Sequence, residues 1–279
     1  MSIDWSQRVA VVTGAAGAIG TEICLRLDRL GLRILAVDLR ADGLEQLAAK
    51  LSRPQLTVAG DLTDPATLER VRATLEAQCG RCDVLINNAG MVVTEPFETA
   101  APAVLRREIE VNLLAPMLLT RTLFPLLQKS GDGRVISVVS LGSILPLGES
   151  PGYSASKFGL RGLMLGLVLR EPKTGVRIST VNPGSVDTPM LRYEAQTGGS
   201  PLNFIDPPLK PEQVAEVVLA RLHQPRAETD VTAADGWLAR LGMLFPNLFH
   251  KLLPWFARRG EKGRQRYLKE KGLEPRAPA

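Results

Sequence analysis

Residues 8–20, RVAVVTGAAGAIG, decide the fold of this chain. The first half is a short β-branched run typical of a buried strand, and the second half is a glycine-rich turn that leads into a helical pattern. Small residues at such a turn let backbone amides approach a pyrophosphate, which the positive end of the following helix also favours. Tight packing of helix on strand is the alternative use of these glycines. The residues expected to hold a dinucleotide here are Thr13, Gly14, Gly17, Ala18, Ile19 and Gly20.

Apolar runs and helical patterns keep alternating along most of the 279 residues. Strands are expected at 8–13, 33–38, 55–60, 82–88, 133–140 and 175–182, with helices near 17–30, 42–52, 64–79, 103–129 and 153–171. This alternation predicts an α/β fold with one doubly wound parallel sheet covered on both faces, a three-layer α/β/α arrangement. Six prolines within 183–211 then predict a long loop, followed by a helix at 212–224 and a short strand at 229–232.

Composition narrows the classes of protein. No basic and apolar leader follows Met1, and no run of eighteen apolar residues occurs, so we expect neither a signal peptide nor a membrane span. The three cysteines favour a reducing, cytoplasmic location, and the C-x-x-C pair of Cys79 and Cys82 follows a predicted helix end instead of opening a helix. Because His223 and His250 are isolated, no metal site is expected.

Polar and small residues recur where the predicted strands end. Asp38 ends the second strand, where a carboxylate accepts ribose hydroxyls and repels a 2′-phosphate, so NAD is expected in preference to NADP. Arg40 lies close by and would soften that preference, which leaves NADP as the alternative. Each of these strand-end residues would also suit an ordinary turn. Further cofactor contacts are expected from Asp61, Leu62, Asn88, Ala89 and Gly90.

Tyr153 and Lys157 stand four residues apart in a predicted helix, so their side chains share one face. A phenol ionises near pH ~10, but an adjacent ammonium stabilises the phenolate and lowers the pKa of the phenol. The pair is therefore expected to exchange a proton with a substrate oxygen near neutral pH. On spacing alone an accidental pair is the commoner explanation, and the other motifs of the chain decide against it.

The order of five motifs resembles one enzyme family. The motifs are T-G-x-x-x-x-x-G at 13–20, N-N-A-G at 87–90, a serine thirteen residues before the tyrosine, Y-S-A-S-K at 153–157 and N-P-G-x-x-x-T at 182–188. Together they resemble the compact, single-domain branch of the short-chain dehydrogenases/reductases, well over 6–190 and loosely over 211–232. The resemblance implies an NAD(P)-binding Rossmann fold, oxidoreductase activity on an alcohol/carbonyl pair, and a homodimer or homotetramer.

The same resemblance implies an active-site tetrad of Asn112, Ser140, Tyr153 and Lys157. Ser140 would hydrogen-bond the substrate oxygen and Tyr153 would exchange its proton. Lys157 would also bind the nicotinamide ribose, and Asn112 would hold a water that links Lys157 to solvent. Ser143 is a rival to Ser140 that the thirteen-residue spacing disfavours. Contacts near the nicotinamide are implied for Pro183, Gly184, Val186 and Thr188.

The chain departs from the family pattern in three places. Ala18 stands where the compact branch has a glycine, and Val139 replaces a frequent second serine before Ser140. The glycine spacing at 14, 17 and 20 instead resembles the extended branch, which includes epimerases and dehydratases. N-N-A-G at 87–90 and the short length favour the compact branch. The third departure is a C-terminus that runs well past the last predicted strand.

This C-terminal segment, 236–279, is expected to be an amphipathic, basic extension of a catalytic domain at 1–235. Apolar residues recur at helical spacing from Trp237 to Phe256, while 236–260 holds four Lys or Arg residues and no acid. Pro246 and Pro254 are expected to divide the segment into shorter helices. The extension would cap the substrate cleft or pack on a partner subunit; the alternative is a peripheral membrane contact through 237–259.

We therefore expect an NAD(P)-dependent oxidoreductase that interconverts a primary or secondary alcohol and a carbonyl by hydride transfer. The apolar extension indicates a lipophilic substrate such as a steroid, retinoid, long-chain alcohol or acyl derivative. The alternatives are an epimerase or dehydratase of the same superfamily and a nucleotide-sensing scaffold without turnover. Nucleic acid ranks last as a partner, because no nucleic-acid motif accompanies the net charge of +5.

Overall fold

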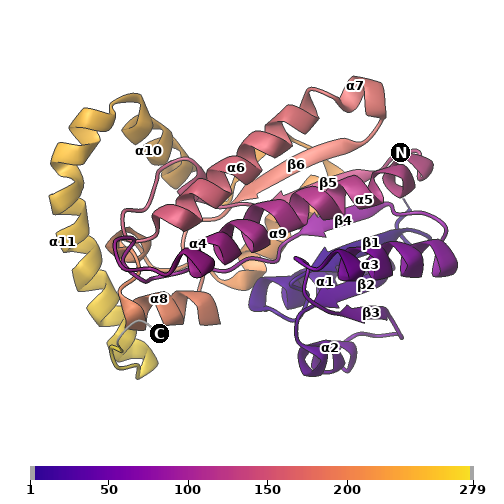
Figure 1. Ribbon diagram of the computed structural model, residues 1–279, viewed down its shortest axis with the longest axis horizontal. Coiled ribbons are helices and arrows are strands. Elements are labelled where there is room, and N and C mark those ends of the chain that lie inside the picture. Colours follow the sequence, from indigo (N-terminus) through magenta and orange to yellow (C-terminus); the bar gives the residue numbers. More distant parts are fainter. Residues whose placement is uncertain (1–3, 277–279) are drawn as a thin grey trace.

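The computed structural model describes residues 4–276 and shows seven parallel strands in one sheet, in the order β3-β2-β1-β4-β5-β6-β7 (Figure 1). Every neighbouring pair of strands is parallel. The predicted strands are all present, with ends shifted by up to two residues. They are β1 (Val9–Thr13), β2 (Arg33–Asp38), β3 (Leu56–Ala59), β4 (Val84–Asn87), β5 (Arg134–Val138), β6 (Arg177–Asn182) and β7 (Glu228–Asp230).

Helices cover both faces of this sheet, as the alternating pattern predicts. One hydrophobic core joins the sheet to α1 (Ala18–Arg29), α2 (Ala41–Ala48) and α9 (Pro211–His223). A second core joins the opposite face to α3 (Pro65–Gln78), α5 (Ala115–Lys129) and α6 (Pro151–Val168). Strands β1, β4 and β5 are buried along their whole length, which agrees with their mostly apolar residues. The three-layer α/β fold is confirmed.

The strand order reverses direction between β1 and β4, which pair side by side at the centre of the sheet. In an open parallel sheet, such a reversal opens a crevice at the carboxyl ends of the strands, where ligands bind. Thr13 ends β1 and Asn87 ends β4, so two of the predicted motifs meet at this crevice. The topology therefore determines where a dinucleotide could lie.

The expectation of one long loop at 183–211 is wrong, because the segment contains α8 (Pro189–Thr197) and a short 3₁₀ turn, η3 (Pro201–Phe204). Thr188 caps α8 by accepting a hydrogen bond from the backbone N–H of Leu191, and Pro189 occupies the first turn. Gly198 ends the helix in a left-handed conformation, with φ of 93°. Three of the six prolines that indicated a loop, Pro189, Pro201 and Pro211, therefore begin helical elements.

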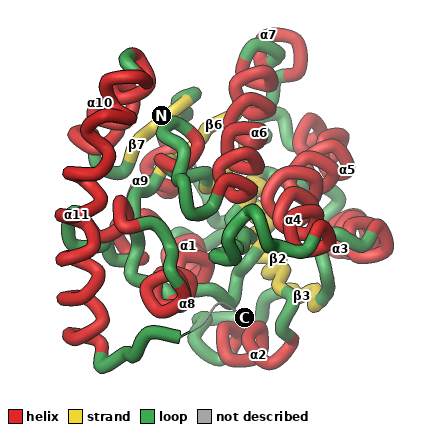
Figure 2. The backbone as a smooth tube through the Cα atoms, turned by 60° about the vertical axis from the view of Figure 1, so that its left-hand side comes forward, coloured by secondary structure: helices red, strands yellow, loops and turns green. Residues whose placement is uncertain are grey.

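The C-terminal extension forms two helices, α10 (Ala233–Leu244) and α11 (Pro246–Lys271), which run along one side of the molecule (Figure 2). Pro246 separates them as expected, since proline is favoured in a first helical turn. The expectation that Pro254 divides the segment is wrong, because Pro254 lies inside α11. A proline there frees the carbonyl of His250 four residues earlier, and His250 is exposed, so solvent can satisfy it.

Two glycines bring the backbone of α11 against η3. A Cβ atom on Gly260 would lie 2.0 Å from the carbonyl oxygen of Pro201, and one on Gly263 would lie 1.8 Å from that of Phe204. Around this contact, Phe204, Tyr267 and Leu268 form a small buried cluster. No side chain larger than hydrogen fits at either glycine without displacing α11, so these glycines fasten the extension to the segment after α8.

The remaining helical elements lie near the site or in the outer layer. They are α4 (Pro102–Ile109), a π-helical turn η1 (Glu110–Leu114), a 3₁₀ turn η2 (Leu141–Ser143) and α7 (Glu171–Thr174). The helical run Pro102–Lys129 is long and apolar enough to cross a membrane by length and composition alone, a test that core helices of soluble proteins also pass. In the fold, this run packs against α3 and α6, as core helices of the same composition do.

Gly263→Ala is expected to lower the thermal unfolding midpoint, because its methyl group must displace the α11 backbone from η3. Overpacking of this kind typically costs about 1–3 kcal/mol. Gly166→Ala in α6 is the matched control, since a Cβ there meets no atom within 4 Å and alanine favours a helix. Differential scanning fluorimetry checks both variants. Equal midpoints for the two would contradict the tight packing of α11.

Candidate functional site

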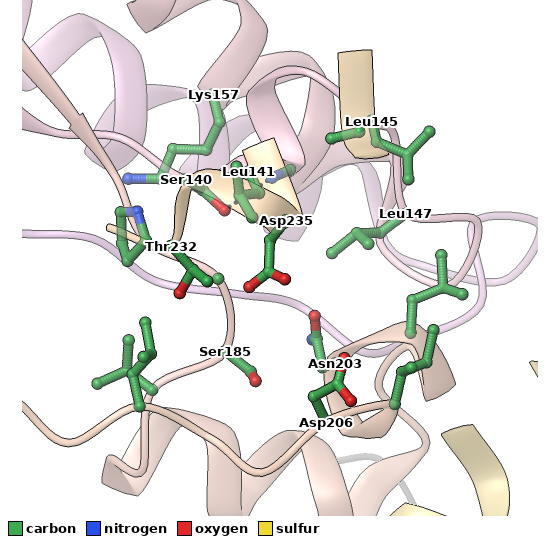
Figure 3. Close-up of a pocket in the computed structure, with 18 of the residues that line it drawn as sticks. Ser140, Leu141, Leu145, Leu147, Lys157, Ser185, Asn203, Asp206, Thr232 and Asp235 are labelled. Carbon is green, nitrogen blue, oxygen red and sulfur yellow. Dashed lines mark hydrogen bonds between the residues drawn. The ribbon is translucent and has the colours of Figure 1, made fainter. Parts of the chain in front are cut away.

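A cavity of about 830 Å³ opens at the carboxyl ends of β5 and β6. Its inner wall carries Ser140, Tyr153 and Lys157, and its outer wall comes from α8, η3, α10 and α11 (Figure 3). Most of the lining is apolar, with side chains that include Leu141, Leu147, Leu202, Leu241, Phe245 and Phe249. The cavity thus joins the predicted catalytic residues to the C-terminal extension.

Ser140 and Tyr153 approach each other where β5 ends and α6 begins. The Ser140 hydroxyl accepts a hydrogen bond of 2.9 Å from the backbone N–H of Gly142 and faces the cavity. Ser143, the rival serine, is fully buried and donates its hydroxyl to the carbonyl of Ser140 at 2.6 Å. Ser143 is not among the residues that line the cavity, so the geometry favours Ser140.

Lys157 and Tyr153 share one face of α6, as their spacing predicts. The Lys157 ammonium lies 5.7 Å from the centre of the Tyr153 ring and donates to the Val138 carbonyl at 3.4 Å. Burial lowers the pKa of Lys157 to about 8, although the nearby Glu108 carboxylate opposes the shift. The side chain is held by the end of β5 and is only weakly ionised above that pH.

The expected net lowering of the Tyr153 pKa is wrong for this geometry, because burial outweighs any effect of the Lys157 charge. Burial raises the pKa of Tyr153 well above its ordinary value, and a hydrogen-bonding interaction with Ser140 only partly opposes the rise. Negative charge on Glu194 or Glu108 would raise this pKa further. The phenol is therefore protonated at neutral pH, the state from which a proton can be given to a substrate oxygen.

Asn112 lies within the π-helical turn η1, a distortion that often occurs at functional sites. Its amide oxygen accepts from the backbone N–H of Met91, and its amide nitrogen donates to the Met91 carbonyl and to the Ser156 hydroxyl. A Cβ on Gly90 would lie 3.3 Å from the Asn112 oxygen and 3.5 Å from the Lys157 nitrogen. Asn112 thus stands behind Lys157 and outside the cavity lining; its predicted role in holding water stays a prediction.

The turn after β1 has the form of a phosphate cradle. Gly14 adopts a left-handed φ of 60°, and a Cβ there would lie 2.9 Å from the Cα of Ala89. Gly17 caps α1 without a side-chain hydrogen bond, and the first turn of α1, which starts at Ala18 and includes Gly20, carries no acid. The free N–H groups at this helix end can therefore bind a phosphate, which fits a dinucleotide cofactor.

Strand-end residues connect this cradle to the centre of the sheet. The Thr13 hydroxyl accepts from the backbone N–H groups of Asn88 and Ala89, and the Asn88 side chain donates to the carbonyls of Thr13 and Gly14. The Asp38 carboxylate accepts the backbone N–H of Ala16 at 2.9 Å, so it stands directly beside the cradle.

Asp61 has other partners than the expected adenine contact. Its carboxylate accepts from the backbone and hydroxyl of Thr63 and pairs with Arg107 at 2.5 Å. The neighbouring Leu62 packs against the core beneath α3 and α5. These contacts hold the turn after β3 in place, and a role for either residue in binding adenine stays a prediction.

The segment after β6 brings the last predicted cofactor residues to the cavity. The wall of the cavity includes four residues of this segment, Pro183, Gly184, Val186 and Thr188. It also includes Ile19, Asn88 and Gly90 from the other predicted motifs. Asp187, inside this segment, accepts from the Tyr267 hydroxyl at 2.7 Å and from Lys271 at 2.6 Å. The far end of α11 is therefore tied directly to the predicted nicotinamide segment.

Two buried carboxyl groups near Tyr153 escaped the sequence prediction. Glu108 accepts from the backbone N–H of Val93 at 2.9 Å, and burial raises its pKa to about 7. Glu194 lines the cavity, and burial raises its pKa to about 8. In the sequence, each acid stands at a helical position beside apolar residues, and this is the available signal of burial. Only the fold shows that both carboxyl groups lie near Tyr153. Among residues 4–276, no group of three or more His, Cys, Asp or Glu could hold a metal.

Comparison with known proteins agrees with this geometry. The sequence model of the family described as short chain dehydrogenase matches residues 8–198. The 1-deoxy-11-beta-hydroxypentalenate dehydrogenase of Streptomyces exfoliatus is 37% identical over 191 residues, 66% of this chain and 70% of its own length. Dehydrogenase/reductase SDR family member 7B of Bos taurus is 27% identical over 272 residues, 92% of this chain and 83% of its own length.

Among solved structures, L-sorbose reductase from Gluconobacter frateurii, in complex with NADPH and L-sorbose, has a similar fold. Its TM-score is 0.73 at 25% identity, over 82% of this chain and 95% of the reductase. The match with the bovine protein reaches into the C-terminal extension, because it spans more of this chain than the family model does. The relatives share the catalytic core and differ in the compounds that their names mention.

Proposed function

The chain belongs to the short-chain dehydrogenase family, and we propose that it interconverts a lipophilic alcohol and the corresponding carbonyl compound. It is an oxidoreductase that uses a nicotinamide dinucleotide, as its family members do. The observation that carries the finer proposal is the apolar cavity beside Tyr153, whose outer wall is built by α10 and α11. A small polar substrate would leave most of that apolar wall in contact with water.

The proposed reaction divides the work between cofactor and protein. A bound nicotinamide cofactor would supply or accept the hydride at the substrate carbon. Ser140 orients the substrate oxygen by a hydrogen bond, and Tyr153 gives or takes the proton at that oxygen. Lys157 holds positive charge close to the phenol, which favours the proton-free form during transfer. Apolar side chains that line the cavity limit the contact of these groups with water.

An epimerase or dehydratase would use the same tyrosine with a cofactor that is recycled in each turnover. A nucleotide-sensing scaffold would have no turnover. Relatives named as dehydrogenases and reductases support the oxidoreductase over both. Net oxidation or reduction of added cofactor separates the oxidoreductase from both alternatives. We also propose that the protein forms a homodimer or homotetramer, and the family resemblance is the ground for this.

Tyr153→Phe is expected to lower kcat roughly 10²–10⁴-fold, because the proton at the substrate oxygen loses its donor and acceptor. Cofactor binding, measured by isothermal titration calorimetry, should stay close to the wild-type affinity. Tyr193→Phe is the matched control, since the Tyr193 hydroxyl lies 3.3 Å from Thr94 and is not part of the cavity wall. Substantial turnover by Tyr153→Phe would exclude the proposed mechanism.

We expect NAD to bind more tightly than NADP, because the Asp38 carboxylate beside the phosphate cradle repels a 2′-phosphate. The similar L-sorbose reductase was solved with NADPH, so this preference rests on Asp38 of this chain. Asp38→Ala should narrow the gap between the two dissociation constants. Arg40→Ala should widen it, because the Arg40 guanidinium lies 4.0 Å from Asp38 and can attract the 2′-phosphate. A lower dissociation constant for NADP in the wild type would contradict the preference.

We also propose that α10 and α11 rest on an anionic membrane surface. Four large apolar side chains outside the cavity lining are exposed along them: Trp237 at 76%, Leu244 at 71%, Trp255 at 59% and Met243 at 39%. Among residues 4–276, Lys251 and Arg258 on α11 make no ion pair, and no acid lies between 236 and 260. An apolar surface with a cationic rim matches anionic lipid, whereas a second copy face to face would bring two such rims together.

Flotation with phosphatidylglycerol vesicles tests this surface. The wild type should float with these vesicles more than with phosphatidylcholine vesicles, and the triple variant Trp237→Ser, Leu244→Ser, Trp255→Ser should remain at the bottom. Leu169→Ser is the control, because Leu169 is 82% exposed at the distant end of α6. Equal flotation of the wild type and the triple variant would overturn the proposal, and concentration-dependent dimerisation lost in the triple variant would indicate a second copy.

A further inference from the structure

Glu194 is a buried carboxyl group in the cavity wall that the proposed reaction does not use. It projects from α8 between Leu191 and Ala195, which are buried in the cluster beneath α11, and it is only 7% exposed itself. A carboxyl in such a place is costly unless hydrogen bonds satisfy it. Its position in the lining of the cavity therefore calls for partners on both of its oxygens.

The protein supplies a partner for one oxygen of this carboxyl group. The side-chain nitrogen of Asn203, in η3, donates to Oε1 of Glu194 at 3.0 Å. Among the residues that the structure describes, none donates to or accepts from Oε2, and this atom is not sealed from the cavity. One face of the Glu194–Asn203 pair is therefore held by the protein, and the other face is available to a bound molecule.

The Asn203 member of the pair lies across the cavity from Ser140 and Lys157. Figure 3 shows Asn203 pointing into the cavity from the side opposite Ser140 and Lys157. Glu194 is also near enough to Tyr153 that its negative charge would raise the pKa of the phenol. A molecule whose reacting oxygen lies at Tyr153 would thus extend toward the pair within the same cavity.

The protonation state of Glu194 suits a neutral partner. Burial raises the pKa of Glu194 to about 8, and the charge of Glu108 acts in the same direction. Near neutral pH the group is therefore largely a carboxylic acid, which carries one O–H donor in addition to its acceptor oxygens. Such a group binds a hydroxyl or a carbonyl oxygen, and it repels no neutral substrate.

We propose that Glu194 and Asn203 form a second polar subsite, which binds a hydroxyl or carbonyl oxygen of the substrate while the reacting oxygen lies at Tyr153. The inference rests on the proposed oxidoreductase function and narrows its substrate class. The substrate is a lipophilic alcohol or ketone that carries a second oxygen, separated from the first by an apolar stretch. A simple hydrocarbon alcohol leaves the subsite without a partner inside the cavity, which binding disfavours.

The test compares decan-2-one with a positional series of hydroxydecan-2-ones, each reduced with NADH and with NADPH. For the wild type, one positional isomer should have a KM about tenfold lower than that of decan-2-one, the size of one well-made hydrogen bond. Glu194→Gln keeps a donor and an acceptor at the same place, so it should retain this KM ratio. Glu194→Met has similar length and neither group, so its ratio should fall to about one.

Glu108→Gln is the matched control, since it removes the other buried carboxyl near Tyr153 but does not alter the cavity wall. Its KM ratio should stay at the wild-type value. Because each ratio is formed within one variant, a loss of folded protein cancels. If Glu194→Met yields no folded protein by thermal unfolding, Asn203→Leu removes the other half of the subsite from a partly exposed position and should also lower the ratio.

The outcomes separate this inference from the proposed function. Reduction of decan-2-one without preference for any hydroxyketone, or a preference that Glu194→Met retains, overturns the subsite and leaves the oxidoreductase standing. In the second case Glu194 only holds η3 through Asn203. No reduction of any ketone in the series overturns the lipophilic substrate and the subsite together.

Discussion

All seven strands run in one direction, and this constraint gathers the chemistry of the molecule at one edge. Because the carboxyl ends of parallel strands meet there, motifs that are far apart in the sequence become neighbours. Thr13 at the end of β1 holds the backbone of Asn88 and Ala89 after β4, and Leu141 after β5 donates its backbone N–H to the carbonyl of Pro183 after β6. The cradle, the tyrosine helix and the cavity all follow from this arrangement.

The C-terminal extension changes the physical character of that edge. Through Gly260 and Gly263, α11 lies against η3, and together with α10 it encloses the space above Ser140 and Tyr153. Burial shifts the pKa values of the ionisable groups in and near the cavity: that of Lys157 falls, while those of Tyr153, Glu108 and Glu194 rise. The same helices expose apolar surface outward, so one segment both encloses the cavity and offers a surface to lipid.

Local sequence signals predicted the elements wherever the period of apolar residues was clear. All seven strands and the helices α1 to α6 and α9 lie near their expected positions, because buried strands and amphipathic helices leave strong patterns. The errors fall where proline was taken as a breaker. Pro189 starts α8 and Pro254 lies inside α11, since the outcome depends on whether the freed carbonyl finds a partner, which neighbouring residues alone do not reveal.

The sequence by itself determined the fold class, the dinucleotide turn and the grouping of Ser140, Tyr153 and Lys157, because each depends on residues within one strand–turn–helix unit. Only the tertiary structure decided what surrounds them. Segments that are distant in sequence bury Tyr153 and so raise its pKa. They also bring Glu108 and Glu194 near the phenol. Burial arises from packing between layers, and so do the distances between residues that are far apart in the sequence. No local pattern of residues encodes them.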